Sequence, residues 1–280
     1  MGIIIGIDVG GSTTKICGFT DDGKKLIKPL FVKATDPLAS VYGAFGKFTQ
    51  INDIPLENVS EVRVTGVGSS FITTDLFERK TKHVEEFNAI GLGGLHLSGL
   101  RRAIVVSMGT GTATVMADAD KDSLVYLGGT GVGGGTLLGL SKKMLNMQDI
   151  SLISELAETG SLDNVDLRIS DITQKNIIPT LPVETTASNF GKLSDIASKG
   201  DIALGIINMI FETIGMIAVF ASRSYGISDI VLTGNLAAIK QAKPTFEGLG
   251  HMFSTNFLIP DIAEFGTVIG AALTYFREEK

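Results

Sequence analysis

Residues 2–17 read Gly-Ile-Ile-Ile-Gly-Ile-Asp-Val-Gly-Gly-Ser-Thr-Thr-Lys-Ile-Cys, and this stretch indicates how the chain folds. Two apolar runs rich in β-branched residues flank a short turn that contains Gly10 and Gly11. Such a pattern is typical of a β-hairpin. We therefore expect the chain to begin with two antiparallel strands joined by a glycine-rich turn.

The turn of this hairpin carries groups that suit a phosphate. Glycines can take positive φ and bring backbone N–H groups close to an anion. Hydroxyl groups and the ammonium of Lys15 follow, and the carboxylate of Asp8 can orient a hydrated Mg²⁺. An ordinary hairpin with a polar tip is the alternative, but the clustering favours phosphate binding. The predicted nucleotide-binding residues here are Asp8, Gly10, Gly11, Ser12, Thr13, Thr14 and Lys15, with Asp8 also holding Mg²⁺ through water.

The same design recurs about a hundred residues later. Residues 103–108 form an apolar run, Gly109-Thr-Gly-Thr112 follows as a turn, and residues 113–117 return as a strand. Two hairpins of this kind suggest two related halves that face each other across a cleft and grip one polyphosphate. We expect an α/β fold with a boundary near residue 100, an N-terminal half over residues 1–100 and a C-terminal half over residues 101–280.

A third glycine-rich segment, residues 128–136, lies between a strand and an amphipathic helix over residues 137–145. Positions 129, 131 and 134 match the spacing G-x-G-x-x-G, but the segment follows a β-hairpin and not the first strand of a βαβ unit. Backbone N–H groups at the start of a helix suit any phosphate, including those of ATP. No G-x-x-x-x-G-K-[ST] occurs, which excludes a P-loop.

Composition narrows the class of protein. The 280 residues are 44% hydrophobic with a net charge of −6, which is typical of a globular chain and gives no electrostatic case for nucleic acid. Cys17 is the one cysteine, so an intramolecular disulfide framework and a cysteine-built zinc site are excluded. The three histidines match no metal spacing. We expect a cytoplasmic protein without a secretory signal.

Further helices are expected at helical spacing of apolar residues. Residues 202–225 are strongly apolar but interrupted by Glu212 and Arg223, which favours a buried helix, at the centre or at a subunit interface, over a membrane span. The other predicted helices cover residues 37–50, residues 87–100 and residues 263–276, and one begins at Lys192.

Four segments together resemble type II pantothenate kinase, a member of the acetate/sugar kinase, heat-shock chaperone and actin superfamily. They are Asp8-x-Gly-Gly with Lys15, Met108-Gly-Thr-Gly-Thr112, the glycines of residues 128–135, and Thr186-Ala-Ser-Asn-Phe-Gly191. The resemblance covers essentially the whole chain, and the last segment with Glu86-Phe87-Asn88 is the most specific part. It implies a duplicated actin-like, ribonuclease H-like fold with two mixed-sheet halves around an ATP cleft, Mg²⁺ as cofactor, and a homodimer.

The resemblance also implies roles for individual residues. Glu86 corresponds to the general base that acts on the acceptor hydroxyl, although the adjacent Glu85 stays open as the base. An acid in the first turn of a helix, stabilised by the helix dipole, is the structural alternative. Tyr126 stands where the family carries an arginine that contacts the acceptor, and Gly128 belongs to the same acceptor loop. Beyond the first hairpin, the implied ATP contacts are Thr110, Gly134, Gly135, Thr136, Leu137, Leu138 and Asn235.

The resemblance therefore predicts ATP-dependent phosphorylation of pantothenate, the first step of coenzyme A biosynthesis. Because Tyr126 replaces a cation, a kinase of pantoate or pantetheine is one alternative. A nucleotide-binding regulatory relative with weak catalysis is another, although a pure binder has no use for Glu86. An activator ATPase of radical enzymes from the same superfamily would need cluster-ligating cysteines, and Cys17 alone does not fit.

Overall fold

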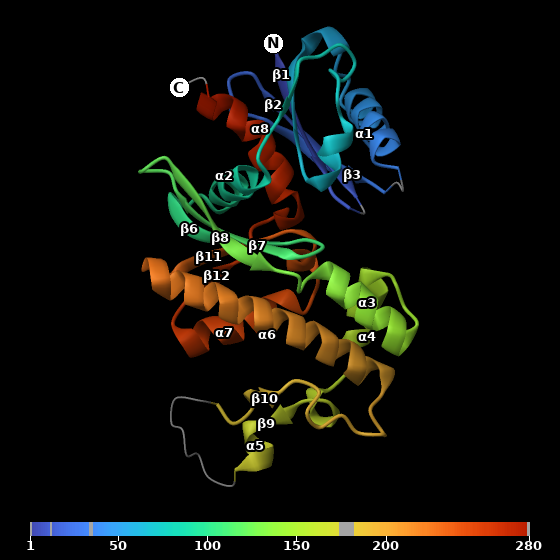
Figure 1. Ribbon diagram of the computed structural model, residues 1–280, viewed down its shortest axis with the longest axis vertical. Helices are drawn as coiled ribbons and strands as arrows, with labels where there is room; N and C mark the ends of the chain where they lie inside the picture. Colours follow the sequence, from blue (N-terminus) through green and yellow to red (C-terminus); the bar gives the residue numbers. More distant parts are fainter. Residues whose placement is uncertain (1, 12, 34–35, 174–181, 279–280) are drawn as a thin grey trace.

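The computed structural model describes residues 2–11, 13–33, 36–173 and 182–278, and it contains two five-stranded sheets arranged along the long axis of the molecule (Figure 1). The first has the order β3-β2-β1-β4-β5 and the second the order β12-β11-β6-β7-β8. The first sheet contains β1 (Ile3–Val9), β2 (Thr14–Thr20), β3 (Leu26–Val32), β4 (Val59–Thr65) and β5 (Thr81–His83). The second contains β6 (Arg102–Met108), β7 (Thr112–Asp118), β8 (Ser123–Thr130), β11 (Asp229–Thr233) and β12 (Asn256–Leu258).

The two sheets repeat one topology. In each, a three-stranded antiparallel meander is followed by two strands parallel to its first strand, namely β4 and β5 beside β1 and β11 and β12 beside β6. The duplicated α/β architecture predicted from the two glycine-rich hairpins is confirmed. Both hairpin turns lie on the side of their sheet that faces the other half.

One face of the first sheet is covered by α1 (Pro37–Ile51). Asp36 caps this helix by accepting a hydrogen bond from the Ala39 N–H, and Pro37 occupies the first turn, where its missing N–H costs nothing. Val41, Ala44, Phe45 and Phe48 recur at helical spacing and are fully buried against the sheet. The periodicity of residues 37–50 thus predicted this helix correctly.

The two halves exchange one helix each. The N-terminal segment contributes α2 (Glu86–Ser98), which packs on β6, β7 and β11 of the second sheet. The C-terminal helix α8 (Gly266–Glu278) crosses back and packs on β1 and β2 of the first sheet. The two helices contact each other closely, because a Cβ on Gly270 would lie 1.7 Å from the Ala89 oxygen. The boundary at residue 100 stays a prediction.

The far face of the second sheet is covered by α3 (Gly134–Leu145), α4 (Ile150–Ala157), α6 (Lys199–Tyr225) and α7 (Ala242–Phe253). By length and hydropathy alone α6 could cross a membrane, but 61% of its apolar stretch is buried inside the protein, as in a core helix. Between α4 and α6 lie β9 (Leu167–Arg168), α5 (Ile169–Ile172) and β10 (Thr186–Ser188). Five 3₁₀ turns complete the described chain: Leu56–Asn58, Val67–Phe71, Leu162–Asn164, Asn235–Ala238 and Ala263–Phe265.

The prediction of a helix from Lys192 is wrong. Residues 192–198 form turns, and α6 begins at Lys199 because Ser198 and Asp201 form a capping box, each side chain accepting from the other's N–H. Helix α7 and the small β9–β10 sheet were not predicted. Pro244 lies in the first turn of α7, where proline is tolerated.

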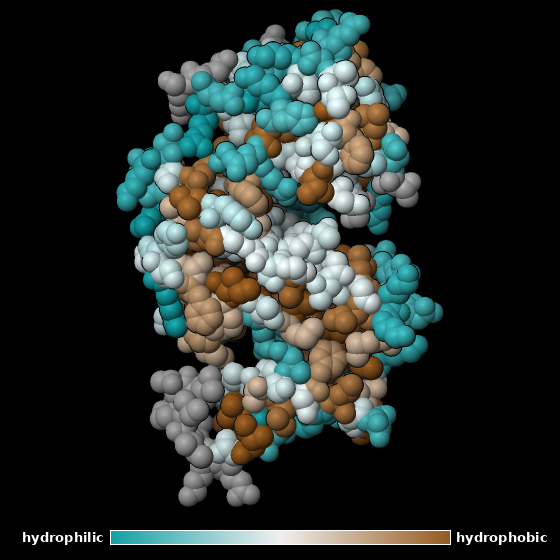
Figure 2. Space-filling view, viewed as in Figure 1, coloured by the Kyte–Doolittle hydropathy of each residue, from teal (hydrophilic) through white to brown (hydrophobic). Residues whose placement is uncertain are grey.

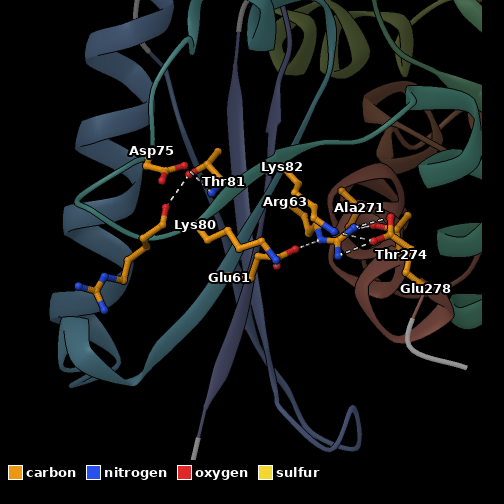
Figure 3. Close-up of polar contacts among 10 residues, drawn as sticks. Glu61, Arg63, Asp75, Lys80, Thr81, Lys82, Ala271, Thr274 and Glu278 are labelled. Atoms are coloured by element: carbon orange, nitrogen blue, oxygen red, sulfur yellow. Dashed lines mark hydrogen bonds and ion pairs between the residues drawn. The ribbon is translucent and has the colours of Figure 1, made fainter.

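An ion network centred on the buried pair Arg63–Glu61 joins α8 to the first sheet (Figure 3). The Arg63 guanidinium on β4 is 2% exposed and binds both carboxylate oxygens of Glu278, at 2.8 and 2.9 Å. Its Nε lies 2.6 Å from Glu61, which in turn pairs with Lys80 at 2.7 Å. Charged groups at this depth are tolerated because each has a partner of opposite charge.

Candidate active site

The first hairpin presents its turn to the space between the two sheets. Asp8 on β1 lies directly opposite Lys15 on β2, and the Gly10 N–H donates to the Thr13 oxygen at 3.0 Å to close the turn. Thr14 is 2% exposed and belongs to the strand behind the turn. Ser12 lies outside the described residues. The turn therefore exposes backbone and hydroxyl groups above one ammonium and one carboxylate.

The second hairpin turn is held by the start of α3. The N–H groups of Gly134 and Gly135 donate to the oxygens of Gly109 and Thr110, both at 2.8 Å. These two N–H groups, predicted as phosphate donors, are thus engaged with the turn itself. Glycine is required for this approach, because a Cβ on Gly133 would lie 2.8 Å from the Thr110 oxygen.

A cleft of about 480 Å³ separates the two hairpin turns. Its walls come from both halves and from the helices that they exchange. The space-filling view shows the molecule narrowed between the two halves (Figure 2). The lining residues are Asp8, Gly10, Gly11, Thr13, Lys15, Gly66, Val67, Glu86, Ile90, Ser107, Gly109, Thr110, Gly111, Thr112, Ala113, Tyr126, Gly129, Thr130, Gly131, Gly234, Asn235 and Thr267.

The charged groups of the cleft perturb one another. Burial raises the pKa of Asp8 above its usual value, and the Lys15 ammonium opposes this rise. Burial lowers the pKa of Lys15, while the carboxylates of Asp8 and Glu264 act against that shift. Each group thus stabilises the charged form of the other in a site that disfavours isolated charge.

Glu86 is the first residue of α2, and its carboxyl group lines the cleft. Burial raises the pKa of Glu86, and the nearby carboxylate of Asp8 raises it further. Glu85 differs in position: it is exposed, stands outside the lining, and accepts a hydrogen bond of 2.9 Å from Asn88. The geometry thus favours Glu86 over Glu85 as a group that can take a proton inside the cleft.

One aromatic side chain among the described residues, Tyr126, borders the cleft. The ring of Tyr126 on β8 stacks on Phe87, with centroids 3.8 Å apart and planes inclined by 13°. Tyr126 lies beside a β-bulge, since Val115 pairs with Tyr126 and Thr114 pairs with Gly128, which leaves Leu127 as the extra residue. Gly128 has φ of 123°, a conformation that favours glycine.

The cleft brings together nine of the predicted site residues, from five separate segments: Asp8, Gly10, Gly11, Thr13, Lys15, Glu86, Thr110, Tyr126 and Asn235. The other described site residues that were predicted are not part of its lining, namely Thr14, Gly128, Gly134, Gly135, Thr136, Leu137 and Leu138. Leu137 is 1% exposed and packs in the core of the second half. Thr136 closes the start of α3 through its hydroxyl, which donates to the Gly131 oxygen at 3.0 Å.

Several lining residues were not predicted. Gly66 and Gly234 both have positive φ and follow the ends of β4 and β11, so glycine after an apolar strand was a usable signal. A Cβ on Gly66 would lie 2.6 Å from the Asp8 carboxylate, which shows how tightly the first half packs at that point. Nothing in the sequence around Thr267 predicted a site residue, because Thr267 reaches the cleft only through the packing of α8 on the first sheet.

The residues present fit a hydrated magnesium ion better than a protein-built metal cage. Among the described residues no group of three or more His, Cys, Asp or Glu side chains could hold a metal. Asp8 offers one hard oxygen donor beside a turn suited to phosphate, and Mg²⁺ typically takes one or two carboxylates together with phosphate and water. The described residues would therefore contribute Asp8 to such an ion.

Solved structures of similar fold come from ATP-binding proteins. The activator of 2-hydroxyisocaproyl-CoA dehydratase from Clostridium difficile, with bound ADPNP, superposes with a TM-score of 0.71 at 17% identity, covering 99% of this chain and 95% of that one. A ROK family glucokinase from Streptomyces griseus, in complex with glucose and AMPPNP, gives a TM-score of 0.61 at 13% identity over 97% and 98% of the two chains. At these identities the likeness shows the actin-like fold.

Sequence comparison is more specific. The family model named Fumble matches residues 47–254. A type II pantothenate kinase of Staphylococcus haemolyticus (strain JCSC1435) is 26% identical over 98% of this chain and 94% of its own length. That of Bacillus cereus (strain AH820) is 27% identical over 82% of each chain. The chain belongs to the Fumble family, together with relatives named type II pantothenate kinase.

Proposed function

We propose that this protein catalyses ATP-dependent phosphorylation of pantothenate to 4'-phosphopantothenate, the first step of coenzyme A biosynthesis. The observation that carries the proposal is the position of Glu86: an acid with a raised pKa lines the same cleft as the two hairpin turns. A carboxylate near the phosphate-binding turns is what transfer of a phosphoryl group to a hydroxyl requires. The names of the curated relatives support the same reaction.

In this proposal each group of the cleft has one task. Glu86 accepts the proton of the acceptor hydroxyl as that oxygen attacks the terminal phosphorus of ATP, whose bond to the bridging oxygen breaks to release ADP. The turns at Gly10–Thr13 and Gly109–Thr112 hold the phosphates between the halves, and Lys15 neutralises charge on the transferring group. Asp8 holds Mg²⁺, which when bound supplies further neutralisation of the phosphates. Asn235, on the turn after β11, contacts the nucleotide.

Tyr126 favours a second candidate, a kinase of pantoate or pantetheine. Tyr126 supplies no positive charge to the cleft, which suits an acceptor without the terminal carboxylate of pantothenate, such as pantetheine. A nucleotide-binding regulatory relative with weak catalysis is the third candidate. It is disfavoured because a protein that only binds nucleotide gains nothing from an acid with a raised pKa in the cleft.

We also propose a cytoplasmic homodimer that associates through α6. Phe220 on this helix is 57% exposed, and Met209, Met216 and Ile217 are only partly buried. In the view of Figure 2, apolar side chains lie along the surface formed by α6. Sedimentation equilibrium of the wild type and of Phe220→Asp tests this: a dimer that becomes a monomer is expected, and a wild-type monomer would refute the dimer.

The decisive experiment measures ADP release with Mg-ATP against pantothenate, pantoate and pantetheine. Wild type, Glu86→Gln and the matched control Glu85→Gln should be compared. We expect acceptor-dependent turnover that collapses in Glu86→Gln and persists in Glu85→Gln. Tight ATP binding without turnover on any acceptor would refute the kinase and favour the regulatory relative.

A further inference from the structure

The segment that leads into Glu86 is short and is held by β4. Strand β5 ends at His83 and α2 begins at Glu86, so only Val84 and Glu85 join the edge strand to the helix. Glu85, at the N-cap of α2, makes no side-chain hydrogen bond to the N–H groups of the first turn. Along the chain before α2, the hydrogen bonds of Val84 are therefore the link to the sheet that lies nearest to Glu86.

Val84 makes two hydrogen bonds to the end of β4. Its N–H donates to the Val64 oxygen at 2.8 Å, which continues the parallel pairing of β4 with β5. Its oxygen accepts a hydrogen bond of 3.0 Å from the Thr65 hydroxyl. Thr65 is 0% exposed, so the folded protein gives water no access to this side chain. One buried hydroxyl thus holds the main chain two residues before Glu86.

Thr65 also connects this segment to the first hairpin. It is the last residue of β4 and lies beside Asp8 of β1 in the register of the two strands. Gly66, with φ of 84°, then turns the chain into the lining of the cleft. The Thr65 hydroxyl therefore spans the step from the strand pair that carries Asp8 to the segment that carries Glu86.

We propose that Thr65 is a positioning residue, whose hydroxyl fixes the position of Glu86 relative to the phosphates bound by the first hairpin. This inference rests on the proposed function, since it concerns the acid and the hairpin of the same cleft. Thr65 is not part of the cleft lining, so it acts through Val84 and not on the ligands. A catalytic geometry that is displaced by about 1 Å can lose about 10²-fold in rate.

Two variants separate the hydrogen bond of Thr65 from the packing of its side chain. Valine has the shape of threonine and favours strands as threonine does, but it lacks the hydroxyl. In Thr65→Val the Val84 oxygen therefore loses its donor, and the start of α2 is held less firmly to β4. In Thr65→Ser the hydroxyl is retained and only a methyl group is lost.

The kinetic test measures ADP release with Mg-ATP and pantothenate, or with pantetheine if the wild type prefers it. We expect Thr65→Val to lower kcat by roughly tenfold or more, with KM for ATP within about twofold of the wild type. Thr65→Ser should recover most of this loss.

The matched control is Thr49→Val, which removes another buried hydroxyl far from the cleft. Thr49 on α1 is 8% exposed, donates to the Phe45 oxygen at 3.0 Å and is not part of the cleft lining. This variant should keep the kcat of the wild type. An unchanged kcat in Thr65→Val, or an equal loss of kcat in Thr65→Ser or Thr49→Val, would overturn the inference.

Amide hydrogen exchange tests the same hydrogen bond without turnover. We expect the Val84 N–H to exchange roughly tenfold faster in Thr65→Val than in the wild type or Thr65→Ser, with the amides of α1 unchanged. Faster exchange in a protein that turns over no acceptor would support the hold of Thr65 on Val84 and refute the kinase. Unchanged exchange of Val84 would refute the positioning role, whether or not the protein is a kinase.

Discussion

The ammonium of Lys15 donates a hydrogen bond of 2.5 Å to the main-chain oxygen of Glu264, a residue 249 positions further along the chain. The same segment holds the turn after β11, because the Gly234 N–H donates to the Ala263 oxygen at 3.0 Å. Residues 262–264 thus connect the cation of the first hairpin with the predicted nucleotide contact at Asn235. The exchange of α8 between the halves creates this connection.

Replacement of Lys15 by methionine should strongly reduce kcat without unfolding the protein. Loss of one positioned charge at a phosphoryl-transfer site lowers kcat by roughly 10²–10³-fold. Methionine fills similar space, but loss of the ammonium leaves the buried Asp8 carboxylate without its counter-charge, so the melting temperature should fall while the protein still folds. Steady-state ADP release and thermal unfolding measure both effects. Lys28→Met, on the exposed surface of β3, is the matched control, and a comparable loss there would contradict the role of Lys15.

Ile262 should be a site where asparagine stabilises the fold. It has φ of 52°, although it is β-branched, and its side chain is 39% exposed. Left-handed backbone costs an ordinary residue roughly 1–2 kcal/mol, and asparagine tolerates it better. We expect Ile262→Asn to raise the free energy of unfolding in urea by about 0.5–1 kcal/mol. Ile196→Asn, at an exposed residue without positive φ, should have little effect; equal effects at both sites would exclude strain as the cause.

Glu86→Gln should lower kcat and raise the melting temperature. Burial and Asp8 raise the pKa of Glu86, so the folded protein binds this proton more tightly than the unfolded chain. Above pH 4.5 the ionised carboxylate therefore lowers stability, and the neutral amide removes that penalty. Glu86→Gln should melt higher than wild type at pH 7, with kcat reduced roughly 10²–10⁴-fold. A lower melting temperature would contradict the burial of the charge.

The fall of wild-type kcat/KM at low pH should also depend on the ionisation of Glu86. A base must be ionised to accept a proton, so kcat/KM should fall as pH decreases through the raised pKa of Glu86, above its ordinary value of 4.5. Glu85→Gln should leave this fall in place. A fall at or below pH 4.5 would assign the base to an unperturbed carboxylate.

Glu278 should stabilise the fold down to unusually low pH. Its hydrogen bonds to Arg63 and Lys82 lower its pKa from 4.5 to about 2. Because the folded pKa lies below the unfolded one, the stabilisation is present above pH 4.5 and is lost as pH falls from 4.5 through 2. Urea unfolding between pH 7 and pH 3 should show a shallower decline for Glu278→Gln than for wild type. Parallel curves would exclude a contribution from this ion pair.

The features that could be predicted from the sequence are those whose residues are neighbours in the chain. The glycines, hydroxyls, Asp8 and Lys15 of the first hairpin are neighbours in sequence, so their conformation and grouping follow from adjacent residues alone. The start of α6 was placed wrongly because apolar spacing is a weaker boundary signal than the capping box of Ser198 and Asp201.

By itself the sequence determined the two hairpins, the repeated design and the acid at the start of α2, because turn preferences and helical periodicity act over a few residues. Only the tertiary structure decided which side chains share the cleft. Three contacts join residues that are far apart in the chain. Lys15 donates a hydrogen bond to the Glu264 oxygen, Phe87 stacks on Tyr126, and Thr267 lines the cleft beside the first hairpin's residues. These contacts follow from burial of α2 and α8 against the opposite sheets, a packing choice that no local pattern encodes.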